Sequence, residues 1–416
     1  MSVRSMSKLG IGGLALAVCA APAPVVRARI TFEFDYSRDS TTFFDANTAD
    51  GLAARAALER AARVYSDRLL DGLSAIAPTS NSWQATFADP RTSTTLAVTD
   101  LAVAADTIKI YVGARGLGPD VARGSAGGYN VFTSNQALAT AIRTRGQAGV
   151  DASTPSDFGP WGGSVTLNAF VSGGWHTGAA APGAGQYDLQ TVALHELGHV
   201  LGVGTAESWK THLAATVTPF GDLQYVGPFT GPKSVAIYGA NVPLEAPPTP
   251  ASAGATVQHA SHFAAGIVGT VGTSANQPAL FGATIPAGVR RQLTELDWAA
   301  LDDLGWSLAR PGDADANGVV ALNDLVVLAN NYGRSAGDAT WADGDFDYDG
   351  NVSLNDLVVL ANAYGTVGGL GEVPPPSPAL DFAADWAYVT GTTVPEPAGM
   401  CGLALVGLAT LTRRRR

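Results

Sequence analysis

Two stretches of this 416-residue chain repeat each other, one beginning at Asp313 and the other at Asp345. Each opens with 12 residues that carry acidic or amide side chains at positions 1, 3, 5 and 12 and glycine at position 6. A 12-residue loop with this spacing supplies oxygen ligands to Ca²⁺, and its glycine allows a sharp turn. The pattern therefore predicts two structural Ca²⁺ sites, in which position 7 contributes a backbone carbonyl; the alternative is a pair of acidic surface turns. The predicted ligands are Asp313, Asp315, Asn317, Val319 and Asp324 in the first loop and Asp345, Asp347, Asp349, Asn351 and Asp356 in the second.

The two repeats also agree after each loop, where the sequence reads Leu-Val-Val-Leu-Ala-Asn and soon afterwards Tyr-Gly. The last loop position is Asp in both, where an EF-hand has Glu. With these features residues 311–366 resemble a type I dockerin domain. The resemblance implies a small α-helical two-repeat module that binds two Ca²⁺ ions and docks on a cohesin-like partner protein. The segment holds nine Asp and one Arg, so we expect its folding to require the metal.

A different metal motif, His195-Glu196-Leu197-Gly198-His199, lies in a segment with helical apolar spacing over residues 188–203. Residues four apart share one face of a helix, so His195 and His199 can bind one metal ion. Neutral imidazoles suit zinc, and zinc lowers the pKa of its bound water to about 7. Glu196 stands beside this pair, where a general base would take a proton from that zinc-bound water. The motif predicts one catalytic zinc site.

The third zinc ligand must come from elsewhere in the chain, because a catalytic zinc usually has three protein ligands. Residues 194–202 resemble the metzincin zinc metallopeptidases, in which a third His follows the last glycine by three residues. Thr205 stands at that position here. The downstream sequence is similar to the leishmanolysin-like and bacterial secreted metzincins, which insert a long segment first. The resemblance implies His262 as the third ligand, with His259 and His212 as alternatives.

The resemblance also implies an activity, a secreted zinc-dependent endopeptidase with a protein or peptide substrate and Glu196 as its base. Metzincins have a Met beneath the metal, and Phe281 stands in the corresponding turn. The alternative interpretation is a catalytically degenerate, calcium-dependent extracellular binding or matrix protein. Other ligand choices that stay open are His176 and, for a different zincin class, Glu207 or Glu245.

The two ends of the chain are typical of targeting segments. Residues 1–28 contain a basic start, an apolar run and small residues, which indicates a secretory signal peptide rather than a buried helix. Residues 394–416 contain Pro-Glu-Pro, an uncharged apolar run and four Arg, an order that resembles the PEP-CTERM sorting signal. That resemblance implies processing by an exosortase-type enzyme at a bacterial cell envelope; a simple tail anchor is the alternative. The apolar run spans about 22 Å as a helix, short of a bilayer core of about 30 Å, so we expect transient membrane association.

Charge and cysteine content argue against nucleic-acid binding and against stabilisation by disulfides. The formal net charge is −11, and no basic stripe exists to bind nucleic acid. The two Cys residues, Cys19 and Cys401, both fall in the terminal targeting segments. The mature protein would therefore be stabilised by its core and its metals rather than by disulfides.

Apolar periodicity predicts an α+β fold. The resemblances imply a zincin-like catalytic domain over residues 29–308, followed by the small α-helical calcium-binding module. Residues 204–285 are rich in Gly, Pro and Thr and are expected to be irregular, and residues 367–393 are expected to be a linker. The predicted helices cover residues 49–73, 135–145, 188–203 and 294–304, and the predicted strands begin at Ile30 and cover 107–112 and 164–170.

Overall fold

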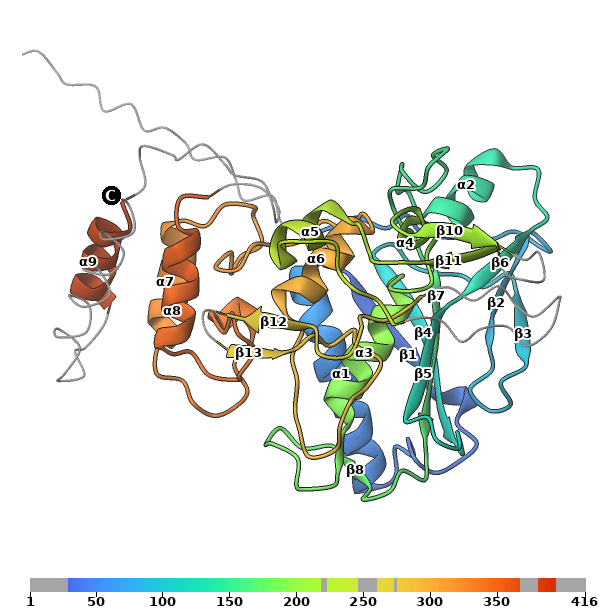
Figure 1. The fold of residues 1–416 in the computed structure, drawn as a ribbon, viewed down its shortest axis with the longest axis horizontal. Helices are drawn as coiled ribbons and strands as arrows, with labels where there is room; N and C mark the ends of the chain where they lie inside the picture. The colour runs from blue at the N-terminus through green and yellow to red at the C-terminus, as the bar shows by residue number, and fades with distance from the viewer. Residues whose placement is uncertain (1–28, 218–222, 246–259, 273–274, 367–380, 394–416) are drawn as a thin grey trace, which may run out of the picture.

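The computed structural model describes residues 29–217, 223–245, 260–272, 275–366 and 381–393. Both predicted targeting segments, 1–28 and 394–416, lie outside these residues. In the described part of the chain, no helix is both long and apolar enough to cross a membrane. Helices and strands are both abundant (Figure 1), so the mixed α and β content expected from the sequence is confirmed.

A four-stranded sheet with the order β1-β4-β7-β5 forms one layer of residues 29–308, which we call the N-terminal body. Strands β1 (Thr31–Asp35), β4 (Thr107–Arg115) and β7 (Gly162–Asn168) run parallel, whereas β5 (Ala122–Ala126) pairs antiparallel to β7 at the end of the sheet. Every residue of β7 is buried. A central strand without an exposed face indicates that both faces of the sheet are covered.

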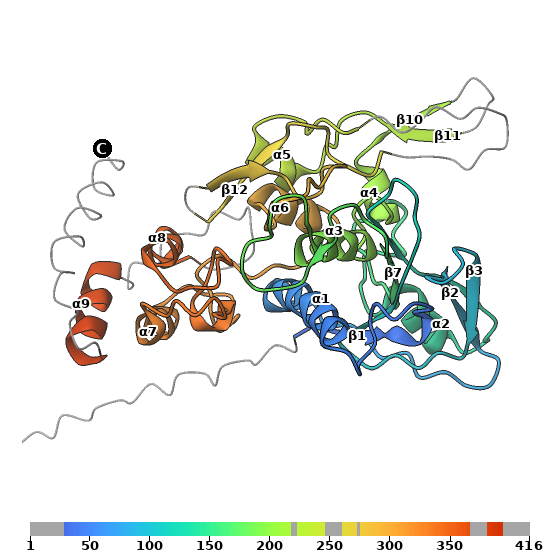
Figure 2. The same cartoon turned by 90° about the horizontal axis from the view of Figure 1, so that it is seen from below.

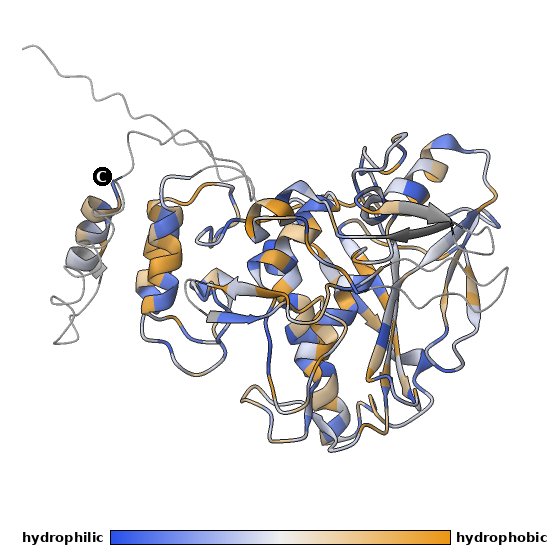
Figure 3. Cartoon of the chain, in the orientation of Figure 1, coloured by the Kyte–Doolittle hydropathy of each residue, from blue (hydrophilic) through white to orange (hydrophobic). Residues whose placement is uncertain are grey.

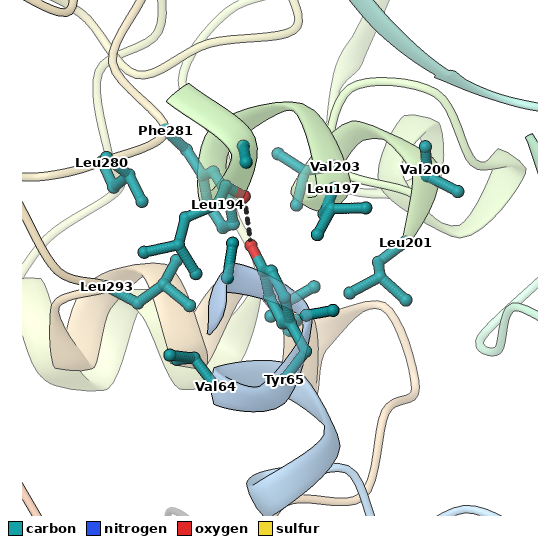
Figure 4. Close-up of a cluster of buried hydrophobic side chains, with 14 of the residues drawn as sticks. Val64, Tyr65, Leu194, Leu197, Val200, Leu201, Val203, Leu280, Phe281 and Leu293 are labelled. Atoms are coloured by element: carbon teal, nitrogen blue, oxygen red, sulfur yellow. Dashed lines mark hydrogen bonds between the residues drawn. The ribbon is translucent and has the colours of Figure 1, made fainter. Parts of the chain in front are cut away.

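Two helices, α1 (Ala49–Arg68) and α3 (Leu189–Val200), lie side by side and pack on this sheet (Figures 1 and 2). Thr48 caps α1 by accepting a hydrogen bond from the Gly51 N–H, and Asp188 caps α3 by accepting one from the Thr191 N–H. The Tyr65 hydroxyl of α1 donates to the Leu194 carbonyl of α3 at 2.6 Å. This bond lies within the main hydrophobic core (Figure 4).

A smaller antiparallel sheet, β3-β2-β6, stands beside the first. An aromatic cluster fills the space between the two sheets, and in it Phe87 stacks on Tyr111 with ring centroids 4.1 Å apart. The sheet consists of β2 (Trp83–Ala88), β3 (Thr95–Thr99) and β6 (Gly128–Val131), and α2 (Gln136–Thr144) lies next to it.

The remaining elements of the N-terminal body are short, apart from the closing helix α6 (Glu295–Asp303). They include two antiparallel hairpins, β10-β11 and β12-β13, within the region that was expected to be irregular. Their bounds are η1 (Tyr36–Arg38), β8 (Trp175–His176), β9 (Tyr187–Asp188), α4 (Glu207–Thr211), β10 (Ala214–Val217), β11 (Leu223–Val226), α5 (Pro232–Tyr238), β12 (Val268–Val271) and β13 (Ala275–Pro278).

A second hydrophobic cluster organises the described residues from 309 onwards, which we call the C-terminal module. Its helices are α7 (Leu322–Asn331), α8 (Leu354–Ala363) and α9 (Phe382–Thr393), with the short η2 (Trp341–Asp343) before the second loop. Apolar residues line α7 and α8 (Figure 3), and Leu325, Leu328 and Leu360 are among the residues buried in the cluster.

Three expectations need correction. Helix α1 ends at Arg68 rather than near residue 73, because Leu69 takes an extended conformation and bridges to Leu308. Residues 204–285 contain the short helices and hairpins given above. The end of the expected linker forms α9, whose Phe382, Trp386 and Val389 join the hydrophobic cluster of the C-terminal module. Residues 367–380 lie outside the described residues.

We predict that Gly198→Ala destabilises the protein by about 1–3 kcal/mol. A Cβ at this position of α3 would overlap the ring of Phe281, which is fully buried. Helix propensity alone would favour Ala by about 1 kcal/mol, so a net loss shows that the overlap dominates. Urea unfolding monitored by circular dichroism measures the effect.

Gly72→Ala is the matched control, because its Cβ would make only an ordinary contact, 3.8 Å from Asp106 Oδ1. Phe281→Met, which replaces the rigid ring by a flexible chain, should restore part of the stability lost in Gly198→Ala. A Gly198→Ala variant as stable as the parent protein would contradict the packing described here.

Candidate metal centres

Helix α3 presents His195 and His199 on one buried face, one helical turn apart. The start of the helix is fixed by Asp188, which is fully buried, caps α3 and forms an ion pair with Arg290 at 2.7 Å. The chain turns sharply after the helix at Gly202, where φ is 109°. A Cβ at Gly202 would lie 2.8 Å from the Phe158 ring, so the turn requires glycine.

His262 completes a cluster with these two residues. His199 Nε2 lies 3.1 Å from His195 Nε2 and 3.1 Å from His262 Nε2. The ligand nitrogens of all three lie within 4.8 Å of one another. The structure thus brings together the residues predicted from the resemblance, although His262 is far from α3 in the sequence.

The two alternative ligands have different positions. His212 lies away from the cluster, with its Nε2 3.1 Å from the Asp303 carbonyl oxygen. His259 lies outside the described residues. Thr205 stands three residues after Gly202, donates its hydroxyl to the His199 carbonyl at 2.8 Å and thereby supports the end of α3.

Backbone carbonyls determine which ring nitrogen carries the proton. His195 Nδ1 lies 2.8 Å from the Leu280 carbonyl oxygen, and His199 Nδ1 lies 2.8 Å from that of Val203. A carbonyl oxygen can only accept, so each Nδ1 donates, and in a neutral ring Nε2 then keeps its lone pair. Two lone pairs 3.1 Å apart cannot form a hydrogen bond with each other, but they can bind one cation.

Electrostatics keep the three imidazoles neutral, as metal binding requires. Burial, followed by repulsion from the neighbouring imidazoles, holds the pKa of His195 well below its ordinary value. Burial also lowers the pKa of His199, and burial together with His199 lowers the pKa of His262 to about 3. Neutral rings that face one point are a donor set typical of zinc.

The spacing of the nitrogens also fits zinc. A tetrahedral Zn²⁺ with Zn–N distances of about 2.0–2.1 Å separates two ligand nitrogens by about 3.3–3.4 Å. The two measured separations of 3.1 Å are close to that value. His195, His199 and His262 are therefore placed to hold one ion.

Glu196, a residue of α3, is buried where this helix meets the end strand β5. A Cβ at Gly124 of β5 would overlap the Glu196 backbone carbonyl, so the strand and the helix touch at this glycine. Burial raises the pKa of Glu196 to about 8, and a hydrogen bond from the Gly124 backbone partly opposes that rise. A carboxyl group with a pKa near neutrality is well matched to general acid and base catalysis.

One buried carboxylate, that of Asp297 in α6, supports the turn that orients His195. This role was not identified from the sequence. It accepts hydrogen bonds from the backbone N–H groups of Leu280 and Phe281, both at 2.9 Å. These bonds fix the turn whose Leu280 carbonyl orients His195. The ring of Phe281 lies 6.5 Å from that of His195. The signal available in the sequence was the spacing of Thr294 and Asp297, which form a capping box.

The two predicted calcium loops have matching internal geometry. In the first, the Asp313 carboxylate accepts from the backbone N–H groups of residues 317 and 318, and Asp324 accepts from those of 314 and 321. In the second, Asp345 and Asp356 accept from the corresponding groups. Carboxylates converge in each loop, as Asp313, Asp315 and Asp324 and as Asp345, Asp347 and Asp349.

The side chains at position 5 hold the middle of each loop. Asn317 accepts from the Val319 N–H, and Asp349 accepts from the Asn351 N–H, both at 2.8 Å. Burial and repulsion from the neighbouring carboxylates raise the pKa of Asp313 to about 7 and that of Asp345 to about 8. Crowded, buried carboxylates fit a hard divalent cation such as Ca²⁺.

Comparison with protein families, with curated proteins and with solved structures gave no match to this chain.

We predict that the protein binds one Zn²⁺ through the histidine cluster and that His262→Ala weakens this binding by more than about 100-fold, because loss of a supporting contact alone weakens such sites by 10–100-fold. Competition with a zinc-sensitive dye measures the affinity. His212→Ala is the matched control and should bind zinc like the parent protein. Equal affinities for the two variants would contradict the three-histidine site.

We also predict that Ca²⁺ stabilises the C-terminal module more at pH 8 than at pH 5. The pKa values of Asp313 and Asp345 are raised above the ordinary 3.8, so the folded module without Ca²⁺ binds more protons than the unfolded chain. Its free energy of unfolding must then fall as pH rises from about 4 to 8. Bound Ca²⁺ removes the loss of stability caused by the charged carboxylates. At a concentration 100 times its dissociation constant, Ca²⁺ adds about 2.7 kcal/mol per site to the free energy of unfolding.

Calorimetry of metal-stripped protein with and without Ca²⁺ measures this difference. Asp345→Asn should reduce it, whereas Asp338→Asn, an exposed position outside the loops, should leave it unchanged. A calcium effect as large at pH 5 as at pH 8 argues against these carboxylates as the ligands.

Proposed function

We propose that this protein is a zinc-dependent endopeptidase of the metzincin type. The observation that carries the proposal is the convergence of the His195, His199 and His262 Nε2 atoms on one point. Helix α3, which carries His195 and His199, also carries the buried Glu196. Two imidazoles one turn apart on a helix can arise in a structural pair. A third imidazole from a distant segment, with its Nε2 3.1 Å from that of His199, is much more specific for a metal.

Each residue has a definite role in this proposal. Zinc held by the three histidines would polarise the substrate carbonyl and make water a better nucleophile at neutral pH. Glu196 would accept the proton of the attacking water and deliver it to the leaving amine. Its burial against β5 supports this role, because a desolvated carboxylate binds a proton more strongly than an exposed one.

The position of strand β5 favours a peptide as the substrate. In the described residues it is the last strand of its sheet, and at Gly124 it touches the backbone of Glu196. An extended peptide can add to such an edge through main-chain hydrogen bonds. A substrate bound along β5 would have its backbone beside the catalytic carboxylate.

The rest of the chain suggests where the enzyme acts. We propose that the C-terminal module is a dockerin-like unit that binds two Ca²⁺ ions and joins the enzyme to a cohesin-like partner. The terminal segments 1–28 and 394–416 would direct secretion and sorting to a bacterial envelope, with processing by an exosortase-type enzyme. These assignments rest on the sequence motifs and on the geometry of the two loops.

The decisive test is Glu196→Gln, which keeps the shape of the side chain but cannot accept a proton. We expect hydrolysis of casein or of a quenched fluorescent peptide to fall by about 10²–10⁴-fold, the usual contribution of general base catalysis. Zinc binding should be retained, because Glu196 is not one of the proposed ligands.

Glu207→Gln is the matched control, since this glutamate is exposed and pairs with Lys210 on α4. Undiminished hydrolysis in Glu196→Gln would exclude the proposed base. A parent protein that binds zinc but hydrolyses no peptide would instead favour the degenerate, calcium-dependent binding protein.

A further inference from the structure

The second calcium loop packs against the N-terminal body. Among the described residues, Tyr348 at position 4 of this loop packs against both the main hydrophobic core and the core of the C-terminal module. Its carbonyl accepts a hydrogen bond from Gln292 Nε2 at 2.8 Å, and its hydroxyl lies 3.4 Å from the Val64 carbonyl of α1. Gly272, which follows β12, faces Asp347, and a Cβ there would lie 2.8 Å from the Asp347 Cβ.

The first loop has no equivalent side chain. Its position 4 is Ala316, whose φ of 56° matches the 57° of Tyr348. The two loops therefore share a left-handed backbone at this position, and only the second carries a ring. This difference gives the second loop a contact that calcium binding alone does not require.

A second contact between the two parts runs through Arg68, at the end of α1. Its side chain is 1% exposed, and its guanidinium lies 4.3 Å from the ring centre of Trp298 in the body and 5.2 Å from that of Trp341 in the module. Trp341 stacks on Tyr348 with ring centroids 5.5 Å apart and donates its indole N–H to the Asp313 carbonyl at 2.6 Å. The Arg68 guanidinium thus joins aromatic side chains of the body and the module.

The same helix reaches the candidate zinc centre. Tyr65, next to Val64 on α1, donates its hydroxyl to the carbonyl of Leu194 at 2.6 Å (Figure 4). Leu194 directly precedes His195 in α3. The ring of Tyr65 also meets that of Trp298 edge to face at 5.7 Å. Helix α1 therefore contacts both the second calcium loop, at Val64, and the helix of the candidate zinc centre, at Tyr65.

We propose that Ca²⁺ in the second loop holds α1 against α3, so that calcium regulates the order of the zinc centre. The left-handed conformation of Tyr348 is unfavourable for a residue with a large side chain, and the crowded loop carboxylates repel each other. A bound Ca²⁺ ion offsets the unfavourable backbone conformation and the repulsion between the carboxylates. It thereby keeps Tyr348 in its contact with α1. Loss of the cation would release the loop and remove that support.

The two states differ in a defined set of contacts, as coupling between distant sites requires. With the loop closed, Tyr348 is stacked on Trp341 and Arg68 is enclosed by both indoles. With the loop open, these contacts are lost and α1 keeps only its contacts within the body. The consequence for catalysis rests on the proposed zinc site, but the coupling itself does not.

The test is hydrogen exchange on the full chain, stripped of metals and then supplied with Ca²⁺ alone. We expect Ca²⁺ to slow exchange in α7 and α8, and also by about ten-fold at the amides of α1 and α3, within the usual range of coupling between sites. In Tyr348→Ala, which gives the second loop the residue of the first, α7 and α8 should still respond, and α1 and α3 should lose most of their response.

Tyr364→Ala is the matched control, because this tyrosine belongs to the same module but contacts α9, where its hydroxyl bonds to Asp385 at 2.5 Å. The response of α1 and α3 should survive in it. Arg68→Met tests the second contact without touching the calcium loop and should also weaken that response.

Two outcomes would overturn the inference. One is a parent protein in which Ca²⁺ protects α7 and α8 but leaves α1 and α3 unchanged. The other is a full response of α1 and α3 in both Tyr348→Ala and Arg68→Met. Because neither zinc nor peptide hydrolysis enters the measurement, a failure of the proposed peptidase activity is distinguished from a failure of the coupling.

Discussion

The candidate zinc centre depends on two backbone carbonyls, those of Leu280 and Val203, that accept the Nδ1 hydrogens of His195 and His199. A carbonyl has no proton to give, so it fixes each imidazole in the tautomer whose Nε2 lone pair points into the cluster. The Leu280 carbonyl is held in turn by Asp297, through bonds to the adjacent N–H groups. The readiness of the centre for a metal is therefore built into the packing of the body.

The parts that could be predicted from the sequence were those whose geometry lies within one element. His195 and His199 are one helical turn apart, and each calcium loop is 12 residues long, so spacing alone places the side chains together. His262 is separated from α3 by a long segment, and spacing did not distinguish it from His212 or His259. Only the resemblance to a family favoured the residue that the structure brings to the cluster.

The parts that were missed depend on contacts between distant residues. The antiparallel end strand β5 has little periodic signal of its own and is defined by pairing with β7. The role of Asp297 follows from a turn far from α3 in the sequence. Helix α9 does have regularly spaced apolar residues, Phe382, Trp386 and Val389, but the preceding prolines and glycines favoured a linker.

One of the differences between the two repeats, Ala316 in the first and Tyr348 in the second, makes the two halves of the C-terminal module unequal. Both loops adopt the same backbone at this position, so either repeat is suited to hold an ion, but only one presents an aromatic ring to its neighbour. A module assembled with its halves in the opposite order would keep both acidic loops and lose the Tyr348 contact with the N-terminal body. The order of the two halves along the chain thus determines which loop faces the N-terminal body, a property that neither half has by itself.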